Sequence, residues 1–170
     1  MAKDGKHVIH AGGIFANPLL NREGTAVAAT QPGTVGYFDA GKFTASVAGD
    51  ESAILYVANF DYLRCKTVDD TIAAGDLVVA IQPQSGMFLN IPAAAGTYTK
   101  GQPVAIANGQ IKVASAGTPA SGDTPAVAAD TVFAYVEEDT ALTAVAGDLV
   151  RSLLAKRPIT WLLTAISSRN

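Results

Sequence analysis

The chain has 170 residues, of which 16% are charged and 49% are hydrophobic, and its net charge is −3. This length fits one domain with a sizeable core, and the weakly negative charge with scattered Lys and Arg argues against a nucleic-acid groove. So few charged side chains predict that other subunits cover part of the surface.

The single cysteine and the absence of long apolar runs bear on the cellular compartment in which the protein is made. Cys65 alone cannot form an internal disulfide framework, and we interpret it as a small buried residue in a strand and not as a nucleophile. The N-terminus lacks the apolar run of a signal peptide, and no run reaches the roughly 18 apolar residues of a membrane span. We therefore expect synthesis in the cytoplasm and no membrane partner.

Residues 1–24 show neither helical nor strand periodicity and are interrupted by Gly and Asn-Pro. We interpret them as an extended N-terminal arm in front of a β-domain that covers residues 25–157. The apolar residues of this arm are too many for a solvated tail, so it should pack on its own body or on a neighbour. These residues are Ile14, Phe15, Leu19 and Leu20.

Short runs and turns follow, as in a β-domain. Residues 34–47 predict a hairpin whose three-residue loop, Asp39-Ala40-Gly41, places Gly41 where a left-handed residue is needed. Residues 54–60 fit a buried strand or a short helix, and their β-branched and aromatic content favours a strand. Residues 87–91 predict another strand, which Pro92 ends.

A Gly-polar turn opens an apolar run at three places, beginning at Gly75, Gly101 and Gly147. This is typical of a strand entered through a tight bend. The spacing is uneven, so the pattern indicates a repeated structural solution and not a solenoid. The second copy leads into the clearest hairpin, in which Asn108-Gly109 separates two alternating runs and supplies the positive φ angles of a type I′ turn.

The remaining segments are distinguished by their composition. Residues 114–130 are almost wholly small or polar and predict a mobile or surface-draped loop. Residues 131–136 resume β-structure, and residues 149–154 predict the last barrel strand. Residues 158–170 form an apolar C-terminal tail around Trp161 and Leu162, which would be costly to leave in water.

The residues that carry chemistry do not converge on a reactive centre. His7 and His10 are spaced like metal ligands on a helix, but the neighbouring glycines argue against a helix and no acid joins them, so no metal site is expected. The acidic pairs Asp69-Asp70 and Glu137-Glu138 resemble solvated turn carboxylates more than a glycosidase pair. A biotin or lipoate carrier domain presents its modified lysine at a hairpin tip, whereas Lys112 lies inside a predicted strand. We therefore expect no catalytic residue and no cofactor.

Two of these openings, at Gly75 and Gly147, read Gly-Asp-Leu-Val, and the third begins the Gly-Gln-Pro-Val hairpin at Gly101. These motifs resemble those of tailed-bacteriophage capsid decoration (cement) proteins. The resemblance covers residues 71–156. It implies an all-β protein with a small β-barrel or sandwich of the β-tulip type, placed on the outer surface of the phage head. It also implies that the protein binds the major capsid protein and stabilises contacts between its subunits.

This resemblance leaves several alternatives open. Another phage structural subunit, such as a head-fibre base or a tail protein, is the second hypothesis, and a β-barrel enzyme or carrier domain is the third. Closed symmetry predicts a homo-oligomer, for which we prefer a trimer to a dimer. The expected partner-binding residues are those of the arm, with Trp161 and Leu162 of the tail.

Overall fold

The regular structure of this protein is almost entirely β-strand, which confirms the all-β prediction. The computed structural model describes residues 5–15, 21–121 and 125–154. Within these ranges the chain forms thirteen strands and one 3₁₀ helix, η1 (Tyr62–Arg64). Four of the predicted partner-binding residues, Leu19, Leu20, Trp161 and Leu162, lie outside the described residues.

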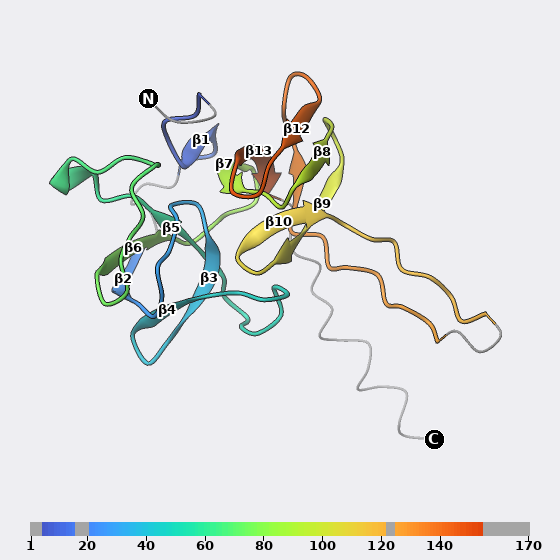
Figure 1. Cartoon of the computed structure of the whole chain (residues 1–170), viewed down its shortest axis with the longest axis horizontal. Coiled ribbons are helices and arrows are strands. Elements are labelled where there is room, and N and C mark those ends of the chain that lie inside the picture. Colours follow the sequence, from blue (N-terminus) through green and yellow to red (C-terminus); the bar gives the residue numbers. More distant parts are fainter. Residues whose placement is uncertain (1–4, 16–20, 122–124, 155–170) are drawn as a thin grey trace.

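Five strands close a barrel in the N-terminal half of the chain, coloured blue to green in Figure 1. Its strands, in order around the barrel, are β2 (Asn21–Ala26), β4 (Lys42–Ala45), β3 (Val35–Asp39), β5 (Tyr56–Asn59) and β6 (Leu77–Ile81). β2 and β4 pair in parallel, and the other pairs are antiparallel. The barrel encloses an apolar cluster that includes Phe43, Tyr56 and Val78.

The other large element is a six-stranded antiparallel sheet. Its strands, in order, are β1 (His10–Gly13), β7 (Met87–Pro92), β13 (Leu149–Leu154), β11 (Ala134–Val136), β9 (Pro103–Ala107) and β10 (Gln110–Val113). A separate two-stranded ribbon joins β8 (Gly96–Tyr98) to β12 (Leu142–Ala144). The sheet lies beside the barrel in Figure 1.

One hydrophobic core joins the barrel to the sheet. Val35, Val57 and Ile81 belong to barrel strands, yet they are fully or almost fully buried in one cluster with Leu89 and Ile91 of the sheet. β3, β5 and β6 are therefore apolar on both faces, one inside the barrel and one against the sheet. Burial on both faces explains why residues 54–60 form a continuous apolar run without alternation.

Both predicted hairpins form, and the sequence anticipated one of them in full. β9 and β10 pair through Ile106 and Ile111, and the turn residues Asn108 and Gly109 have φ angles of 51° and 76°, as predicted. β3 and β4 also pair, but Asp39 pairs with Lys42, so the loop has two residues and not three. Ala40, like Gly41, has a positive φ, which the sequence did not predict because alanine rarely adopts it.

The tip of the β9–β10 hairpin is wedged against the barrel. The Asn108 amide donates to the Val47 carbonyl at 2.8 Å and the Gly109 amide donates to the Ser46 carbonyl at 2.6 Å, while the Val35 amide donates to the Gly109 carbonyl at 2.8 Å. The turn thus satisfies backbone groups of β3 and of the loop after β4. A feature that is local in sequence becomes the junction between the two halves.

The loop at this junction is folded around one carboxylate. Glu51 accepts hydrogen bonds from the Ser46 hydroxyl and from the amides of Val47 (2.6 Å), Ala48 (2.7 Å) and Gly49 (3.2 Å). Partial burial raises the pKa of the Glu51 carboxyl, but these hydrogen bonds outweigh that effect and lower it to about 2. The ionised form of Glu51 therefore stabilises the junction.

Several expectations about strand placement were wrong. Residues 149–154 form β13, which lies inside the six-stranded sheet and not in the barrel. Residues 10–13 and 21–26 are strands, so the region read as an arm contributes to both the sheet and the barrel, and residue 24 falls within β2. Cys65 is exposed, with a φ of 56°, at the end of η1 and not buried in a strand. Its left-handed conformation ends the helix, and no periodicity signals this.

A pair of glycine substitutions tests the junction. Gly109 and Gly41 both have positive φ angles, but a Cβ on Gly109 would lie 2.7 Å from Thr34 Cγ2, whereas one on Gly41 would meet nothing within 4 Å. G41A should cost about 1 kcal/mol for its backbone conformation alone, and G109A should cost more by about 1–2 kcal/mol because of overpacking. Urea unfolding measures both, and equal losses would contradict the packing role of Gly109.

A pH series tests Glu51. Because its pKa is lowered on folding, the stabilisation is present above the unfolded value near 4.5 and is lost as the pH falls towards 2. The free energy of unfolding of the wild type should therefore decrease over this range. E51Q should be less stable at pH 7 and should show a smaller decrease between pH 5 and pH 2. Parallel curves for the two proteins would show that Glu51 does not provide this linkage.

Candidate interaction surface

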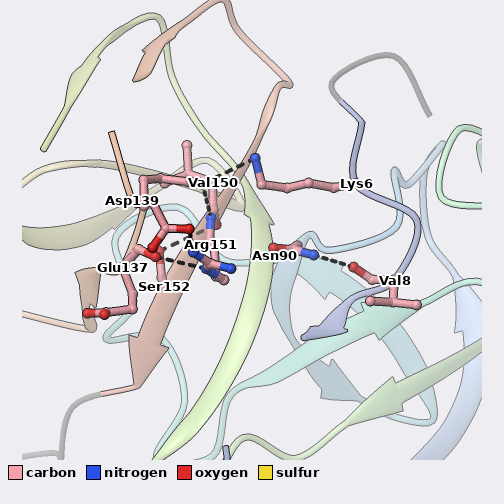
Figure 2. Close-up of polar contacts among 9 residues, drawn as sticks. Lys6, Val8, Asn90, Glu137, Asp139, Val150, Arg151 and Ser152 are labelled. Carbon is pink, nitrogen blue, oxygen red and sulfur yellow. Dashed lines mark hydrogen bonds and ion pairs between the residues drawn. The ribbon is translucent and has the colours of Figure 1, made fainter. Parts of the chain in front are cut away.

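The first described segment, residues 5–15, is fastened across the edge of the six-stranded sheet. β1 pairs with β7, and Ile9 just before it is fully buried in the main core. Asn90 of β7 makes two hydrogen bonds to this segment. Its backbone amide donates to the Ile9 carbonyl at 2.8 Å. Its side-chain Nδ2 donates to the Val8 carbonyl at 2.6 Å (Figure 2). Its Oδ1 is buried without a hydrogen-bond donor among the described residues. The polar anchor thus carries an unsatisfied atom, a cost offset by its two contacts.

An ion pair fixes the start of the same segment. The Lys6 ammonium lies 3.2 Å from a carboxylate oxygen of Glu138, and the two side chains are only 19% and 13% exposed. The same carboxylate accepts a 2.6 Å hydrogen bond from the backbone amide of Arg151 in β13. Glu138 therefore connects the N-terminal segment to the centre of the sheet, and it is not the solvated turn carboxylate that the sequence suggested.

Beyond this anchor, the segment presents two large apolar side chains to solvent. Ile14 is 57% exposed and Phe15 is 66% exposed. Their backbone is held in place, because the Ile14 amide donates to the Gly86 carbonyl at 3.0 Å. The ring of His10 lies 5.2 Å from that of Phe15, and its Nε2 is 3.2 Å from the Ile14 carbonyl. An apolar pair that is ordered before binding loses little conformational entropy when a partner covers it.

The charged side chains next to Glu138 form ion pairs with one another. The Glu137 carboxylate lies 2.6 Å from the Lys100 ammonium. The Asp139 carboxylate lies 3.0 Å from the Arg151 guanidinium, and Figure 2 shows both of these residues. The hydrogen bond from Lys100 to Glu137, with the opposite charge, raises the pKa of Lys100. Elsewhere Asp70 accepts a 2.7 Å hydrogen bond from the Thr67 amide, which lowers its pKa. Each carboxylate thus has a structural role that explains its position.

The described residues contain no cluster of three or more His, Cys, Asp or Glu side chains that could hold a metal ion. His10 begins a strand, so it and His7 do not share the helical face that metal-ligand spacing would need. Over the same part of the chain, no helix has the length and apolar character needed to cross a bilayer. No protein-family model and no curated protein sequence matches this chain.

The sequence indicated part of this surface and missed the rest. It singled out Ile14 and Phe15 as apolar arm residues, and the structure places both on the surface. It missed the anchors Ile9 and Asn90, which are distant in sequence and become neighbours only when β1 joins β7. The β-branched pair Val8-Ile9 was the one local signal for a strand at this point.

Two adjacent substitutions test the anchor. I9A removes a fully buried side chain and should reduce the free energy of unfolding by about 2–4 kcal/mol. It should also increase amide hydrogen exchange in residues 9–14. V8A removes a side chain that is 46% exposed and should change stability by at most about 0.5 kcal/mol. If V8A and I9A behaved alike, Ile9 would not be the anchor.

Proposed function

We propose that this protein is a structural subunit of a tailed-bacteriophage virion that decorates the outer surface of the head and stabilises contacts between major capsid subunits. The observation that carries the proposal is the ordered, solvent-exposed pair Ile14 and Phe15 beside an anchored edge strand. The resemblance of residues 71–156 to capsid decoration proteins implies the class of partner, the major capsid protein. Leu19, Leu20, Trp161 and Leu162 are proposed as further contacts on the basis of the sequence.

Binding to an assembled shell requires only small contacts of the kind described above. A protein that binds only the assembled shell stabilises it by mass action, and many copies on one lattice add avidity. Covering the two apolar side chains would contribute roughly 1.5–3 kcal/mol for each one fully buried. Small contacts therefore suffice when they are repeated over a head, and a homo-oligomer, for which we prefer a trimer, would multiply them further.

The second candidate is another phage structural subunit, such as a head-fibre base or a tail protein. The same exposed apolar pair would serve it, so the choice depends on where the protein binds. The enzyme and carrier alternatives have less support. Lys112, the lysine within the β9–β10 hairpin, lies in β10 and not at the turn, and it forms an ion pair with Asp130 at 2.8 Å.

Binding to undecorated phage heads tests the proposal. Purified protein should bind such heads saturably, and the double variant I14S/F15S should bind at least about tenfold more weakly, which corresponds to about 1.4 kcal/mol. V27S, which alters a valine that is 52% exposed on the barrel side, is the matched control and should bind normally. Co-sedimentation with heads gives the affinities. Absence of saturable binding, together with binding to tails or fibres, would establish the second candidate instead.

A further inference from the structure

The outer face of the six-stranded sheet, which points away from the core, carries a row of apolar side chains. Directly paired residues of antiparallel strands place their side chains on the same face of a sheet. Such pairs connect one residue in each of β9, β11, β13 and β7, and we call these four residues the outer row: Pro103, Tyr135, Leu153 and Phe88.

The outer row is incompletely covered by the described residues. The chain neighbours of its members, among them Leu89 and Leu154, are buried in the core, so strand alternation directs the row to the opposite side. Tyr135 is 42% exposed, and the other three members are half-buried. Single exposed apolar side chains are ordinary, whereas a continuous apolar patch across adjacent strands marks a contact surface.

An open hollow of about 330 Å³ lies at the β1 end of the row. No side chain stands opposite Phe88 in β1, because its pairing partner there is Gly12. The Phe88 ring leans over this strand, since a Cβ on Gly13 would lie 2.9 Å from Phe88 Cδ2. An apolar cavity of about 150 Å³ holds benzene, so the hollow has room for an aromatic side chain. Arg151 also lines it, and a guanidinium is a favourable neighbour for an indole ring.

The chain itself brings an apolar segment to this surface. β13 ends at Leu154, directly after Leu153 of the outer row, and the Leu154 carbonyl accepts a 3.3 Å hydrogen bond from the Gly86 amide. The described part of the chain therefore ends at the margin of the outer face. The residues that follow include the apolar run that contains Trp161 and Leu162.

This run is within reach of the hollow. Trp161 follows Leu154 by seven residues, which span at most roughly 25 Å. The hollow lies between β13 and β1, which are separated by two strand spacings, or about 10 Å. Arg151 on its wall is three residues back along β13, which is also about 10 Å. Pro158 has no amide hydrogen with which to extend the strand ladder, so a change of direction before Trp161 is favoured.

Proximity favours the same chain over a second copy as the source of the covering segment. A covalent connection this short keeps the effective concentration of Trp161 near the outer row in about the millimolar range. A second copy at micromolar concentration competes poorly with it. Two copies also carry a net charge of −3 each and repel one another.

We propose that residues 159–163 dock on the outer row of their own chain in the free protein, with Trp161 in the hollow beside Phe88. Five extended residues span roughly 17 Å, which is enough to cross the three strand spacings from β1 to β11, about 14 Å. The inference goes beyond the proposed function. Because Trp161 and Leu162 are also proposed to contact the shell, binding to a head would transfer them from the outer row to the capsid.

Fluorescence tests this docking, because Trp161 is the only tryptophan of the chain. In the free wild type its emission should lie at shorter wavelength, and be quenched less by acrylamide, than in a peptide of residues 155–170. Y135E places a charge in the outer row and F88S removes the aromatic wall of the hollow, so both should shift the emission towards that of the peptide. Y62E, at a position that is 64% exposed in η1, is the matched control for Y135E and should leave the emission unchanged.

Circular dichroism shows whether each variant keeps the fold, and Y135E decides alone if F88S does not, because Tyr135 is the more exposed residue. A wild-type emission equal to that of the peptide would overturn the inference. So would a Y135E emission equal to that of the wild type, or an equal shift in Y62E. A wavelength shift that disappears on dilution together with a fall in mass would identify a second copy as the occupant and would also overturn it.

Binding to undecorated heads is measured separately. If Trp161 emits like the peptide and the protein still binds heads saturably, the inference is wrong and the proposed function stands. If Y135E shifts the emission and Y62E does not, while the wild type does not bind heads, the inference stands and the proposed function fails.

Discussion

Three strands of the barrel, β3, β5 and β6, have apolar side chains on both faces, and the architecture depends on covering both. The inner face packs around Phe43, and the outer face packs on the six-stranded sheet through Val35, Val57 and Ile81. Each of these outer side chains contributes roughly 1.5–3 kcal/mol when buried. Neither half would be complete alone, because separating them would expose this face to water. The barrel and the sheet therefore behave as one body.

A rigid body of this kind can present weakly supported segments to partners in a defined geometry. The N-terminal segment is anchored through Ile9 and Asn90, and the chain after β10 is held where Asp130 pairs with Lys112 and accepts a hydrogen bond from the Ser115 amide. Both sets of contacts lie on strands of the six-stranded sheet or beside them, so the positions of the exposed pair Ile14-Phe15 and of the chain just after β10 are set by the same core. Segments held in this way lose less entropy on binding than free tails.

Several carboxylates of this protein hold parts of the structure together. Glu51 organises the junction loop, Glu138 joins Lys6 to β13, and Glu137 and Asp139 pair with basic side chains. The hydrogen bonds to Glu51 lower the pKa of its carboxyl to about 2, so this carboxylate is stabilised in its charged form.

The sequence alone determined what depends on neighbouring residues: the all-β class, the apolar runs, and the turn at Asn108-Gly109, whose positive φ angles are a local requirement. It also marked Ile14 and Phe15 as apolar residues that should pack either on the body of the protein or on a neighbour. Only the tertiary structure decided that β13 belongs to the sheet, that Ile9 and Asn90 hold the N-terminal segment, and that Lys6 meets Glu138 across most of the chain. Backbone hydrogen bonds between strands are the same for every sequence, so they do not encode which strands pair. That choice is made by burying both faces of the barrel strands at once, which no local pattern contains.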